Sequence, residues 1–363
     1  YDALAPVQWP VTREYPTGTP RMFETPKFFT PDRKARFVPV MPRPARHATS
    51  RDYPLVLNTG RIRDQWHTMT RTGKTARLMS HIFEPYAEFH PEDARLAGLQ
   101  ADALARLRSP WGEMIARVVV SAEQRRGCVF VPMHWNEEFA GEGRVNALVN
   151  PATDPLSGQP ESKHTPVKAE PYAPKWHAFI LSRSEIRLPT DGYWVHGKAG
   201  NCWRLELAGD DPPANWRDWA RAQLGLEHAG IEWIVYSDPT VGRFRYAAVR
   251  DGRLEGCVFV APDHTLVSRA WLTSLFAEEQ LSANARISLL AGRPSGSGED
   301  IGPIVCSCFS VGRHQIAAEI RKGVADVGEV GRRLKAGTNC GACRPEISKL
   351  LSTATTRAQA IVS

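Results

Sequence analysis

Residues 306–309 read Cys-Ser-Cys-Phe, and residues 337–345 read Gly-Thr-Asn-Cys-Gly-Ala-Cys-Arg-Pro. Four of the chain's seven cysteines therefore form two tight pairs, Cys306-x-Cys308 and Cys340-x-x-Cys343, with 31 residues between them. An odd cysteine total without a regular framework argues against a secreted disulfide scaffold and for reduced thiols that bind metal. Four thiolates make one complete ligand set, which a tetrahedral zinc ion or an iron–sulfur cluster could use.

Local features around the two pairs favour the iron–sulfur cluster. A CxC pair is tighter than a zinc knuckle, which prefers two to four intervening residues, whereas adjacent thiolates can reach one iron of a 2Fe-2S centre. Ser310 is predicted to cap a helix ending at Gly323, and Pro345 to occupy the first turn of another helix. Both pairs should then precede helix N-termini, which stabilise anionic sulfur. Gly337 and Gly341 would let the backbone approach the sulfurs closely.

These cysteine pairs resemble those of a known family. They are similar to the bacterioferritin-associated-ferredoxin-like (BFD-like) 2Fe-2S domain, a small helical domain in which a CxC pair is followed by a CxxC pair. The alternatives are a structural zinc site and four unrelated core cysteines. The resemblance implies that the cluster ligands are Cys306, Cys308, Cys340 and Cys343. The remaining cysteines are expected to pack in the hydrophobic core: Cys128, Cys202 and Cys257.

A second chemical signal directly follows a short apolar strand predicted at residues 55–57. Residues 59–68 read Thr-Gly-Arg-Ile-Arg-Asp-Gln-Trp-His-Thr. A glycine turn would bring hydroxyl, guanidinium, indole and imidazole donors to one strand end, where they could hold phosphates and a purine edge. A plain polar loop is the alternative interpretation. We interpret His67 as a donor that orients a ligand, and we assign no catalytic residue in this chain.

Further short strands are predicted around this loop, at residues 103–107, 114–120 and 128–131. Residues 90–94, His-Pro-Glu-Asp-Ala, place proline and acids where a first helical turn favours them, and Gly98 lies where that helix would end. Closely spaced strands with one or two short helices favour a β-rich barrel over a doubly wound sheet. Residues 146–175, rich in proline, asparagine and aspartate, are predicted to form a long loop.

This region resembles the molybdopterin dinucleotide-binding C-terminal domain of the DMSO-reductase superfamily. The resemblance is carried by residues 59–68, by residues 90–94, by Val131-Pro-Met-His-Trp135 and by residues 146–163. The last stretch reads Asn-Ala-Leu-Val-Asn-Pro-Ala-Thr-Asp-Pro-Leu-Ser-Gly-Gln-Pro-Glu-Ser-Lys. The resemblance implies a double-psi β-barrel that clasps a molybdopterin guanine dinucleotide.

The same resemblance assigns the dinucleotide contacts to the strand-end loop, to the asparagine that opens the long loop and to the lysine that closes it. Arg61 and Lys163 would face the pyrophosphate. The family often has an aromatic residue where Met133 stands, and another where Ser162 stands. The predicted contacts are Thr59, Gly60, Arg61, Ile62, Arg63, Asp64, Gln65, Trp66, His67, Thr68, Met133, Asn146 and Lys163.

The whole chain is predicted to be multidomain. Its middle unit is predicted to be α+β, and its clearest signal is a hairpin of residues 243–249 and 253–260, because Asp251-Gly252 supplies the positive φ angles of a type I′ turn. Trp271 and Leu275 mark one face of a helix. The predicted order is an extended entry segment (1–50), the barrel (51–175), the middle α+β domain (176–293), a linker (294–302), a small helical 2Fe-2S domain (303–353) and a tail (354–363).

Composition limits the partners and the location. Hydrophobic residues make up 42% and charged residues 23% of the chain, as in soluble globular proteins. A net charge of +7 suits an anionic partner, but no basic run is interleaved with aromatics, so nucleic acid is not expected. No apolar run approaches the roughly 18 residues that span a bilayer. We therefore expect no membrane partner and a cytoplasmic location.

The combination of this barrel with a C-terminal 2Fe-2S domain resembles assimilatory nitrate reductases. It implies reduction of nitrate to nitrite at a Mo-bis-MGD cofactor, with electrons entering through the 2Fe-2S cluster from a ferredoxin, a flavodoxin or a flavoprotein NADH-dependent reductase subunit. Because the chain opens with Tyr1, we expect it to be part of a longer protein whose N-terminal portion holds the molybdenum ligand and a 4Fe-4S cluster. This portion alone should be inactive. The alternatives are another enzyme of the superfamily, such as a formate dehydrogenase, and a non-enzymatic electron-transfer module.

Overall fold

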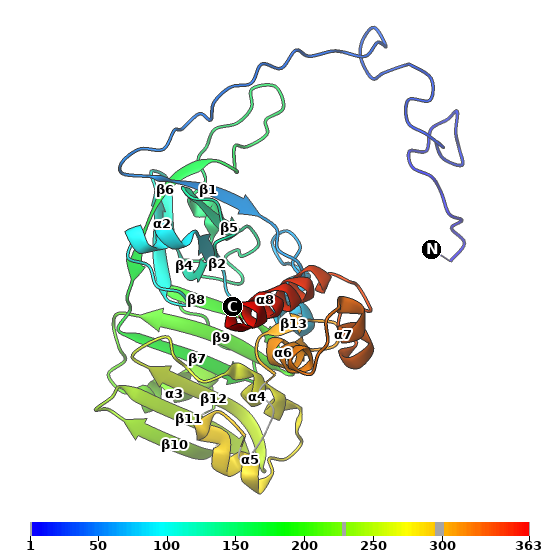
Figure 1. The fold of residues 1–363 in the computed structure, drawn as a ribbon. Coiled ribbons are helices and arrows are strands. Elements are labelled where there is room, and N and C mark those ends of the chain that lie inside the picture. Colours follow the sequence, from blue (N-terminus) through cyan, green and yellow to red (C-terminus); the bar gives the residue numbers. More distant parts are fainter. Residues whose placement is uncertain (1, 227–229, 295–300, 363) are drawn as a thin grey trace. The chain divides into compact units, whose positions relative to one another are not determined.

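The strands that begin at Leu55 close into a six-stranded barrel in this computed structural model (Figure 1). Their order around the barrel is β1-β5-β2-β4-β3-β6, and β6 closes it by pairing with β1. The β1–β5 and β2–β4 pairs are parallel, and the other pairs are antiparallel. The strands are β1 (Leu55–Gly60), β2 (Tyr86–Phe89), β3 (Leu104–Ser109), β4 (Gly112–Val120), β5 (Cys128–Pro132) and β6 (Thr165–Tyr172).

Apolar side chains of these strands fill the barrel and leave its polar loop at one end. Leu57, Phe89 and Leu107 are completely buried in its core. Strand β1 ends at Gly60, where an added Cβ would lie 2.7 Å from the ring of Phe130. Glycine is therefore needed at this close approach, and the loop of residues 61–68 begins directly after it.

The prediction of a loop over residues 146–175 is wrong in its second part, because Thr165–Tyr172 forms strand β6. This strand pairs with β1 and with β3, so it is the element that closes the barrel. Pro166 and Pro171 concealed the strand, since proline cannot donate to a sheet ladder and is normally taken as a strand breaker. The loop proper starts at the short 3-10 turn η2 (Val145–Ala147) and ends before Thr165.

Short helices surround the barrel. The helix predicted near residue 90 is present as α2 (Pro91–Leu96), capped by the His90 ring, which accepts a hydrogen bond from the Glu92 N–H. Gly98 follows with a φ of +67°, as expected of the residue that ends a helix. Two further elements, η1 (Thr72–Lys74) and α1 (Ala76–Met79), lie between β1 and β2 and contact the next sheet.

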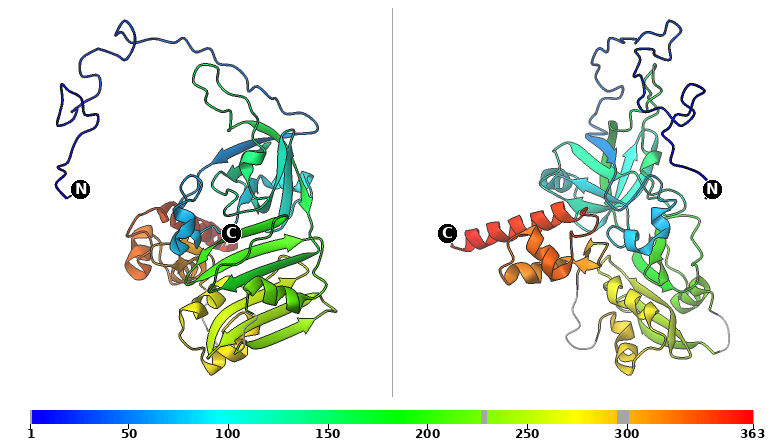
Figure 2. Two further views of the ribbon diagram at one scale, coloured as in Figure 1. Left: turned by 180° about the vertical axis from the view of Figure 1, so that it is seen from behind. Right: turned by 90° about the vertical axis from the view of Figure 1, so that its right-hand side faces the viewer.

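A six-stranded antiparallel sheet follows the barrel along the chain (Figure 2). Its strand order is β10-β11-β12-β7-β9-β8. The turn between β11 and β12 has φ angles of +49° at Asp251 and +77° at Gly252, which confirms the predicted hairpin. The strands are β7 (Trp176–Ser182), β8 (Tyr193–Ala199), β9 (Cys202–Gly209), β10 (Glu232–Asp238), β11 (Arg243–Arg250) and β12 (Arg253–Ala261).

Helices cover both faces of this sheet. Helix α3 (Trp216–Leu224) packs on one face through Ala220 and Leu224. Leu272 of α4 and Leu289 of η4 pack on the other. The predicted helix face around Trp271 is split between α4 and a 3-10 turn. The elements on this second face are α4 (Arg269–Ser274), η3 (Leu275–Ala277), α5 (Ala283–Ser288) and η4 (Leu289–Ala291).

In addition to their own cores, the barrel and the sheet share a hydrophobic cluster at their junction. Tyr193 and Val195 of strand β8 pack in the same group of buried side chains as Phe83 from the barrel side. Backbone hydrogen bonds cross the same junction, since the His196 N–H donates to the Phe139 carbonyl at 2.9 Å. The two units are therefore joined by core packing and by backbone pairing together.

The C-terminal unit, which we call the cysteine unit (residues 301–362), holds the two cysteine pairs. Its buried apolar residues, among them Val305, Ile316, Val330 and Ile347, form a core of their own. Every member of that core within the described residues comes from this unit. Its elements are β13 (Ile304–Cys306), β14 (Val311–Gly312), α6 (Arg313–Arg321), α7 (Val327–Leu334) and α8 (Arg344–Val362).

The structure describes residues 2–226, 230–294 and 301–362, with side chains in α8 described up to residue 354. The chain divides into Tyr1–Ala45 and Arg46–Ser363. In the described part of the first of these, regular pairing is limited to a bridge between Gln8 and Gly18. Residues 295–300 of the predicted linker lie outside the described residues. Within the described ranges, no helix combines the length and apolar character needed to cross a membrane.

Candidate functional site

The four C-terminal cysteines meet in the structure as two pairs of thiols. Cys308 Sγ lies 3.4 Å from Cys340 Sγ, and Cys306 is the neighbouring thiol that, after burial, contributes to the raised pKa of Cys343. Each pair combines one thiol from the CxC stretch with one from the CxxC stretch. Whether the two thiols of the CxC stretch can reach one iron stays a prediction.

The two thiol pairs differ in burial. Cys306 and Cys343 are buried, Cys308 is half-buried and Cys340 is exposed, so one edge of the site reaches the surface. Burial raises the pKa of the Cys343 thiol to about 11. Within the described residues, no three or more His, Cys, Asp or Glu side chains gather around a single point that could hold one metal ion. Two separate thiol pairs suit a two-iron cluster, in which each iron takes two thiolates.

The prediction that Ser310 caps a helix directly after the first cysteine pair is wrong. Ser310 has a φ of +53° and lies between β13 and β14, while helix α6 begins at Arg313 with Gly312 as its N-cap. The Gly312 N–H is satisfied by the Gln315 side chain at 3.1 Å. The short β13–β14 pairing occupies the residues that follow the first pair, which moves the helix start along the chain.

The prediction for the second cysteine pair is confirmed. Helix α8 begins at Arg344, directly after Cys343, and Pro345 lies in its first turn. Gly337 and Gly341 have φ angles of +81° and +75°, a conformation that favours glycine. The N-terminus of α8 therefore directs its backbone N–H groups towards the region of the thiols.

The isolated cysteines are placed nearly as predicted. Cys202 and Cys257 are buried in the core of the antiparallel sheet. Cys257 lies within β12, and burial is the main reason that its thiol pKa is raised. Cys128, at the start of β5, is only half-buried, so the core prediction is only partly met there.

The strand-end loop presents several polar side chains to solvent. Arg61, Trp66 and His67 are exposed, and the Arg61 guanidinium lies over the Trp66 ring, 5.1 Å from its centroid. Lys163, which is also exposed, donates from Nζ to the Thr59 carbonyl. In the part of the chain that the structure describes, neither Arg61 nor Lys163 takes part in a salt bridge. Both cations are therefore available to an anionic ligand.

His134 holds this loop in place, and the sequence analysis missed that role. Its ring is fully buried, its Nε2 accepts a hydrogen bond from the Ile62 N–H at 3.0 Å, and its Nδ1 lies 2.7 Å from the His67 carbonyl. Because Nε2 accepts, the ring is neutral and Nδ1 donates. Burial lowers the pKa of His134, which favours that neutral form. Asn136 Nδ2 adds a hydrogen bond to the Thr68 carbonyl at 3.1 Å.

The opposite side of the loop contacts the cysteine unit. Arg63 Nη2 donates to the Val305 carbonyl and to Glu346 Oε2, both at 2.7 Å. Ser307 Oγ donates to Asp64 Oδ2 at 2.9 Å. Val305 and Ser307 are the residues directly before and after the first cysteine. The side chains of Arg63 and Asp64, predicted as dinucleotide contacts, are thus engaged by the cysteine unit.

The remaining predicted contacts lie in different surroundings. Gln65 is buried, whereas Asn146 is exposed within the turn η2. Met133 packs against the barrel core, and its N–H donates to the Gly60 carbonyl at 2.9 Å. The buried asparagine of the long loop is Asn150, whose amide donates to the backbone carbonyls of Glu161 and His164 near the end of that loop. Of the predicted contacts, the structure thus hydrogen-bonds Lys163 to Thr59 and Met133 to Gly60. It buries the side chain of Gln65.

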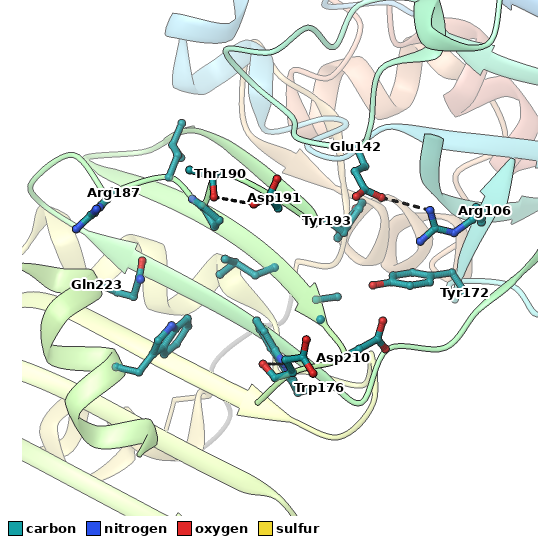
Figure 3. Close-up of a pocket in the computed structure, with 18 residues that line it drawn as sticks. Arg106, Glu142, Tyr172, Trp176, Arg187, Thr190, Asp191, Tyr193, Asp210 and Gln223 are labelled. Carbon is teal, nitrogen blue, oxygen red and sulfur yellow. Dashed lines mark hydrogen bonds and ion pairs between the residues drawn. The ribbon is translucent and has the colours of Figure 1, made fainter. Parts of the chain in front are cut away.

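A separate cavity of about 590 Å³ lies between the barrel and the antiparallel sheet (Figure 3). Arg106 and Glu142 line it from the barrel side, with Trp176 and Asp210 from the sheet side. None of the residues predicted to bind a cofactor or a metal lines this cavity. It is therefore not part of the candidate sites.

Comparison with known proteins matches each of the two candidate sites to a known domain. Residues 55–166 match the Molydopterin dinucleotide binding domain, and residues 304–353 match the BFD-like 2Fe-2S binding domain. The chain is 41% identical over 356 residues to a nitrate reductase of Klebsiella oxytoca. The aligned region covers 97% of this chain and 39% of that protein. The chain is thus similar to nitrate reductases over nearly its whole length.

Other relatives match a smaller part of the chain. The assimilatory nitrate reductase catalytic subunit of Bacillus subtilis is 34% identical over 167 residues, 46% of this chain and 23% of that protein. The F420-dependent formate dehydrogenase subunit alpha of Methanocaldococcus jannaschii is 33% identical over 164 residues, 45% of this chain and 24% of that protein. The chain thus spans at most about two fifths of the length of these relatives.

The cofactors of these two domains are a molybdopterin dinucleotide and a 2Fe-2S cluster, and the side chains present in the chain fit both. Two thiol pairs supply the four sulfur ligands that a two-iron cluster requires. The exposed cations Arg61 and Lys163 suit a pyrophosphate, and the exposed Trp66 ring offers a flat surface beside them. The donor chemistry of each site therefore agrees with its domain.

Proposed function

We propose that this chain is the part of a nitrate-reducing enzyme that holds the molybdopterin dinucleotide and the 2Fe-2S cluster. The observation that carries the proposal is the similarity to a nitrate reductase over 97% of the chain, which includes both cofactor-binding domains. The bound molybdenum cofactor would supply the chemistry that converts nitrate to nitrite. The residues of this chain would hold, orient and electrically connect the two groups.

The four cysteines of the cysteine unit are proposed as the cluster ligands, with one thiol pair for each iron. The exposed position of Cys340 supports entry of electrons at this edge, because a redox partner can approach it. The proposed donor is a ferredoxin, a flavodoxin or a flavoprotein NADH-dependent reductase subunit. Residues 301–354 contain eight Lys or Arg and four Asp or Glu, and this excess of positive charge suits an acidic donor.

The barrel is proposed to have the double-psi topology and to clasp molybdopterin guanine dinucleotide, as one of the two pterins of a Mo-bis-MGD cofactor. The exposed Arg61 and Lys163 would bind its phosphates. Trp66 and His67 would lie against it from the same loop. The locked backbone of that loop supports this assignment, because the His134 ring fixes it at Ile62 and at His67 before any ligand binds.

The intact enzyme is proposed to serve nitrate assimilation in the cytoplasm. This chain alone is not expected to reduce nitrate, since it spans 39% of its Klebsiella oxytoca relative and we expect the molybdenum ligand outside it. The 4Fe-4S cluster expected in the remainder stays a prediction.

A formate dehydrogenase is the second candidate, because formate dehydrogenase subunits are about as similar to part of this chain as the assimilatory nitrate reductase subunit is. Those matches cover 45% of the chain, whereas the nitrate reductase match covers 97%. The wider match favours nitrate. Turnover of nitrate and of formate by the full-length enzyme would separate the two.

Anaerobic purification of the chain, followed by a visible spectrum and by iron and sulfide analysis, tests the proposal directly. We expect a red-brown protein with about two irons per chain, and the Cys340→Ser variant should lose its colour. A colourless protein with one zinc would contradict the proposal. A cluster-bearing chain that does not bind the pterin cofactor would instead favour a non-enzymatic electron carrier.

A further inference from the structure

The loop of residues 61–68 has two chemically different sides. On one side Arg61, Trp66 and His67 are exposed. On the other side Arg63 and Asp64 are largely buried, with 19% and 9% of their side-chain surfaces accessible. Different residues of one polar loop thus face two different places, and only the exposed residues are open to a dinucleotide.

The buried side forms a polar network with the segments that carry the cysteines. Arg63 donates to the carbonyl of Val305, which precedes the first cysteine, and to Glu346, in the first turn of α8 after the last cysteine. Asp64 accepts a hydrogen bond from Ser307, which lies between Cys306 and Cys308. Two adjacent residues of the barrel therefore hold both cysteine stretches at once.

His81 completes this network. Its Nδ1 lies 3.4 Å from Asp64 Oδ2, and its Nε2 lies 3.5 Å from Glu346 Oε2. Its side chain is 12% exposed, so the ring fills the space between the barrel and the cysteine unit. The contact is thus continuous from Ser307 through Asp64 and His81 to Glu346.

We propose that Arg63 and Asp64 are positioning residues for the 2Fe-2S cluster rather than contacts of the dinucleotide, so that one loop fixes the places of both redox groups. This inference rests on the proposed function, because it takes the cysteines as cluster ligands. Family resemblance placed all of residues 59–68 against the pterin, and this proposal assigns Arg63 and Asp64 a different role. The exposed residues of the same loop keep that role.

The two positions carry opposite charges, and this gives the proposal a distinctive signature. Reduction adds an electron to the cluster, so a nearby cation stabilises the reduced form and a nearby anion destabilises it. Removing the charge of Arg63 should lower the midpoint potential of the cluster. Removing the charge of Asp64 should raise it. A merely structural role would not move the potential in opposite directions.

The experiment is a redox titration of the anaerobically purified full chain, followed by electron paramagnetic resonance. Arg63→Ala is expected to shift the midpoint potential to more negative values, and Asp64→Asn to more positive values. Arg63→Lys, which retains the charge, is expected to restore much of the original potential. If Arg63→Ala does not fold, Ser307→Ala removes only the hydroxyl that binds Asp64 and should still alter the spectrum.

Lys349→Ala serves as the matched control. Lys349 of the cysteine unit pairs with Glu123 of the barrel at 2.8 Å, but their side chains are 56% and 70% exposed. This variant removes another cation from the same contact at an exposed position, and it should leave the midpoint potential and the spectrum unchanged.

Unchanged potentials and spectra in Arg63→Ala, Asp64→Asn and Ser307→Ala, with a cluster present in each, would overturn the positioning role and leave the proposed function intact. Shifts of the same sign in Arg63→Ala and Asp64→Asn would also overturn it. A wild-type chain without iron would overturn both, so failure of the inference and failure of the proposed function are distinguishable.

Discussion

The barrel contacts its two neighbours in different ways. Towards the antiparallel sheet it shares a hydrophobic cluster, and a largely buried carboxylate, Glu84, accepts hydrogen bonds from Tyr193 of the sheet and Arg117 of the barrel. Towards the cysteine unit the described contact is mainly polar, through Arg63 and Asp64, and the unit keeps a core of its own.

This difference separates a structural junction from a functional one. The shared hydrophobic cluster makes the barrel and the sheet one cooperative body, because a packing change in one unit strains the tightly packed side chains of the other. A polar contact between separate cores allows a unit to open without unfolding its neighbour. The cysteine unit, where electrons are proposed to enter, is thus attached by the junction that can open without unfolding the barrel.

The largest expected effect is on the barrel–sheet junction. Glu84→Ala leaves Arg117 largely buried without its carboxylate partner, which should lower the free energy of unfolding by about 3 kcal/mol. Urea unfolding of the full chain measures this. Glu137→Ala is the control, because Glu137 forms an exposed ion pair with Arg144 whose loss should cost less than about 1 kcal/mol. Equal losses in the two variants would contradict the account.

Acid should weaken the same junction. Burial lowers the pKa of His177, on β7, to about 4, so the folded protein keeps this ring neutral while the unfolded chain takes up a proton below its ordinary value. Stability is therefore fully present above about pH 6.5 and falls as the pH drops towards 4, by on the order of 3 kcal/mol from this group. Unfolding measured over that pH range checks it, and the His177→Asn variant should show a weaker dependence. An unchanged slope in the variant would refute the assignment.

At lower pH a second group should add to the loss. Burial opposes ionisation of Glu84, but Arg117, Arg204 and Tyr193 outweigh it and lower its pKa to about 2. Its contribution is present above its ordinary value near 4.5 and is lost as the pH falls through about 2. In Glu84→Gln this acid step should disappear from the unfolding curve. Its persistence there would show that another group titrates.

A smaller effect is expected at the polar junction. Glu346→Gln removes the charge that Arg63 binds, and it should weaken attachment of the cysteine unit by about 1 kcal/mol with little effect on the core of the barrel. Faster proteolysis between the sheet and the cysteine unit, with the barrel still resistant, is the expected observation.

The smallest effect belongs to Lys349→Ala, which should change stability by less than about 0.5 kcal/mol.

The sequence predicted the chemistry at the ends of the elements better than the contacts between units. The Asp251-Gly252 turn and the start of α8 at Arg344 follow from local backbone preferences, which a sequence shows directly. Strand β6 was missed because Pro166 and Pro171 contradict a strand locally, while pairing on both sides stabilises it. Long-range pairing of this kind leaves no local signal.

The candidate site shows the same limit. The two tight cysteine stretches are visible in the sequence, but nothing local shows that Cys308 lies beside Cys340 across the unit. Residues 59–68 could be recognised as one motif, but nothing in the sequence shows that Arg63 and Asp64 turn away from Arg61. His134 could have been noticed only by asking which buried ring satisfies the backbone of that loop.

Hydrogen exchange of the cluster-loaded chain in low salt and in about 1 M NaCl tests the contrast between the two junctions most directly. The account predicts faster exchange in high salt for residues 304–312 and 344–351 of the cysteine unit, with no change in strand β8 at the barrel–sheet junction. Equal responses at both junctions, or a response confined to β8, would contradict it.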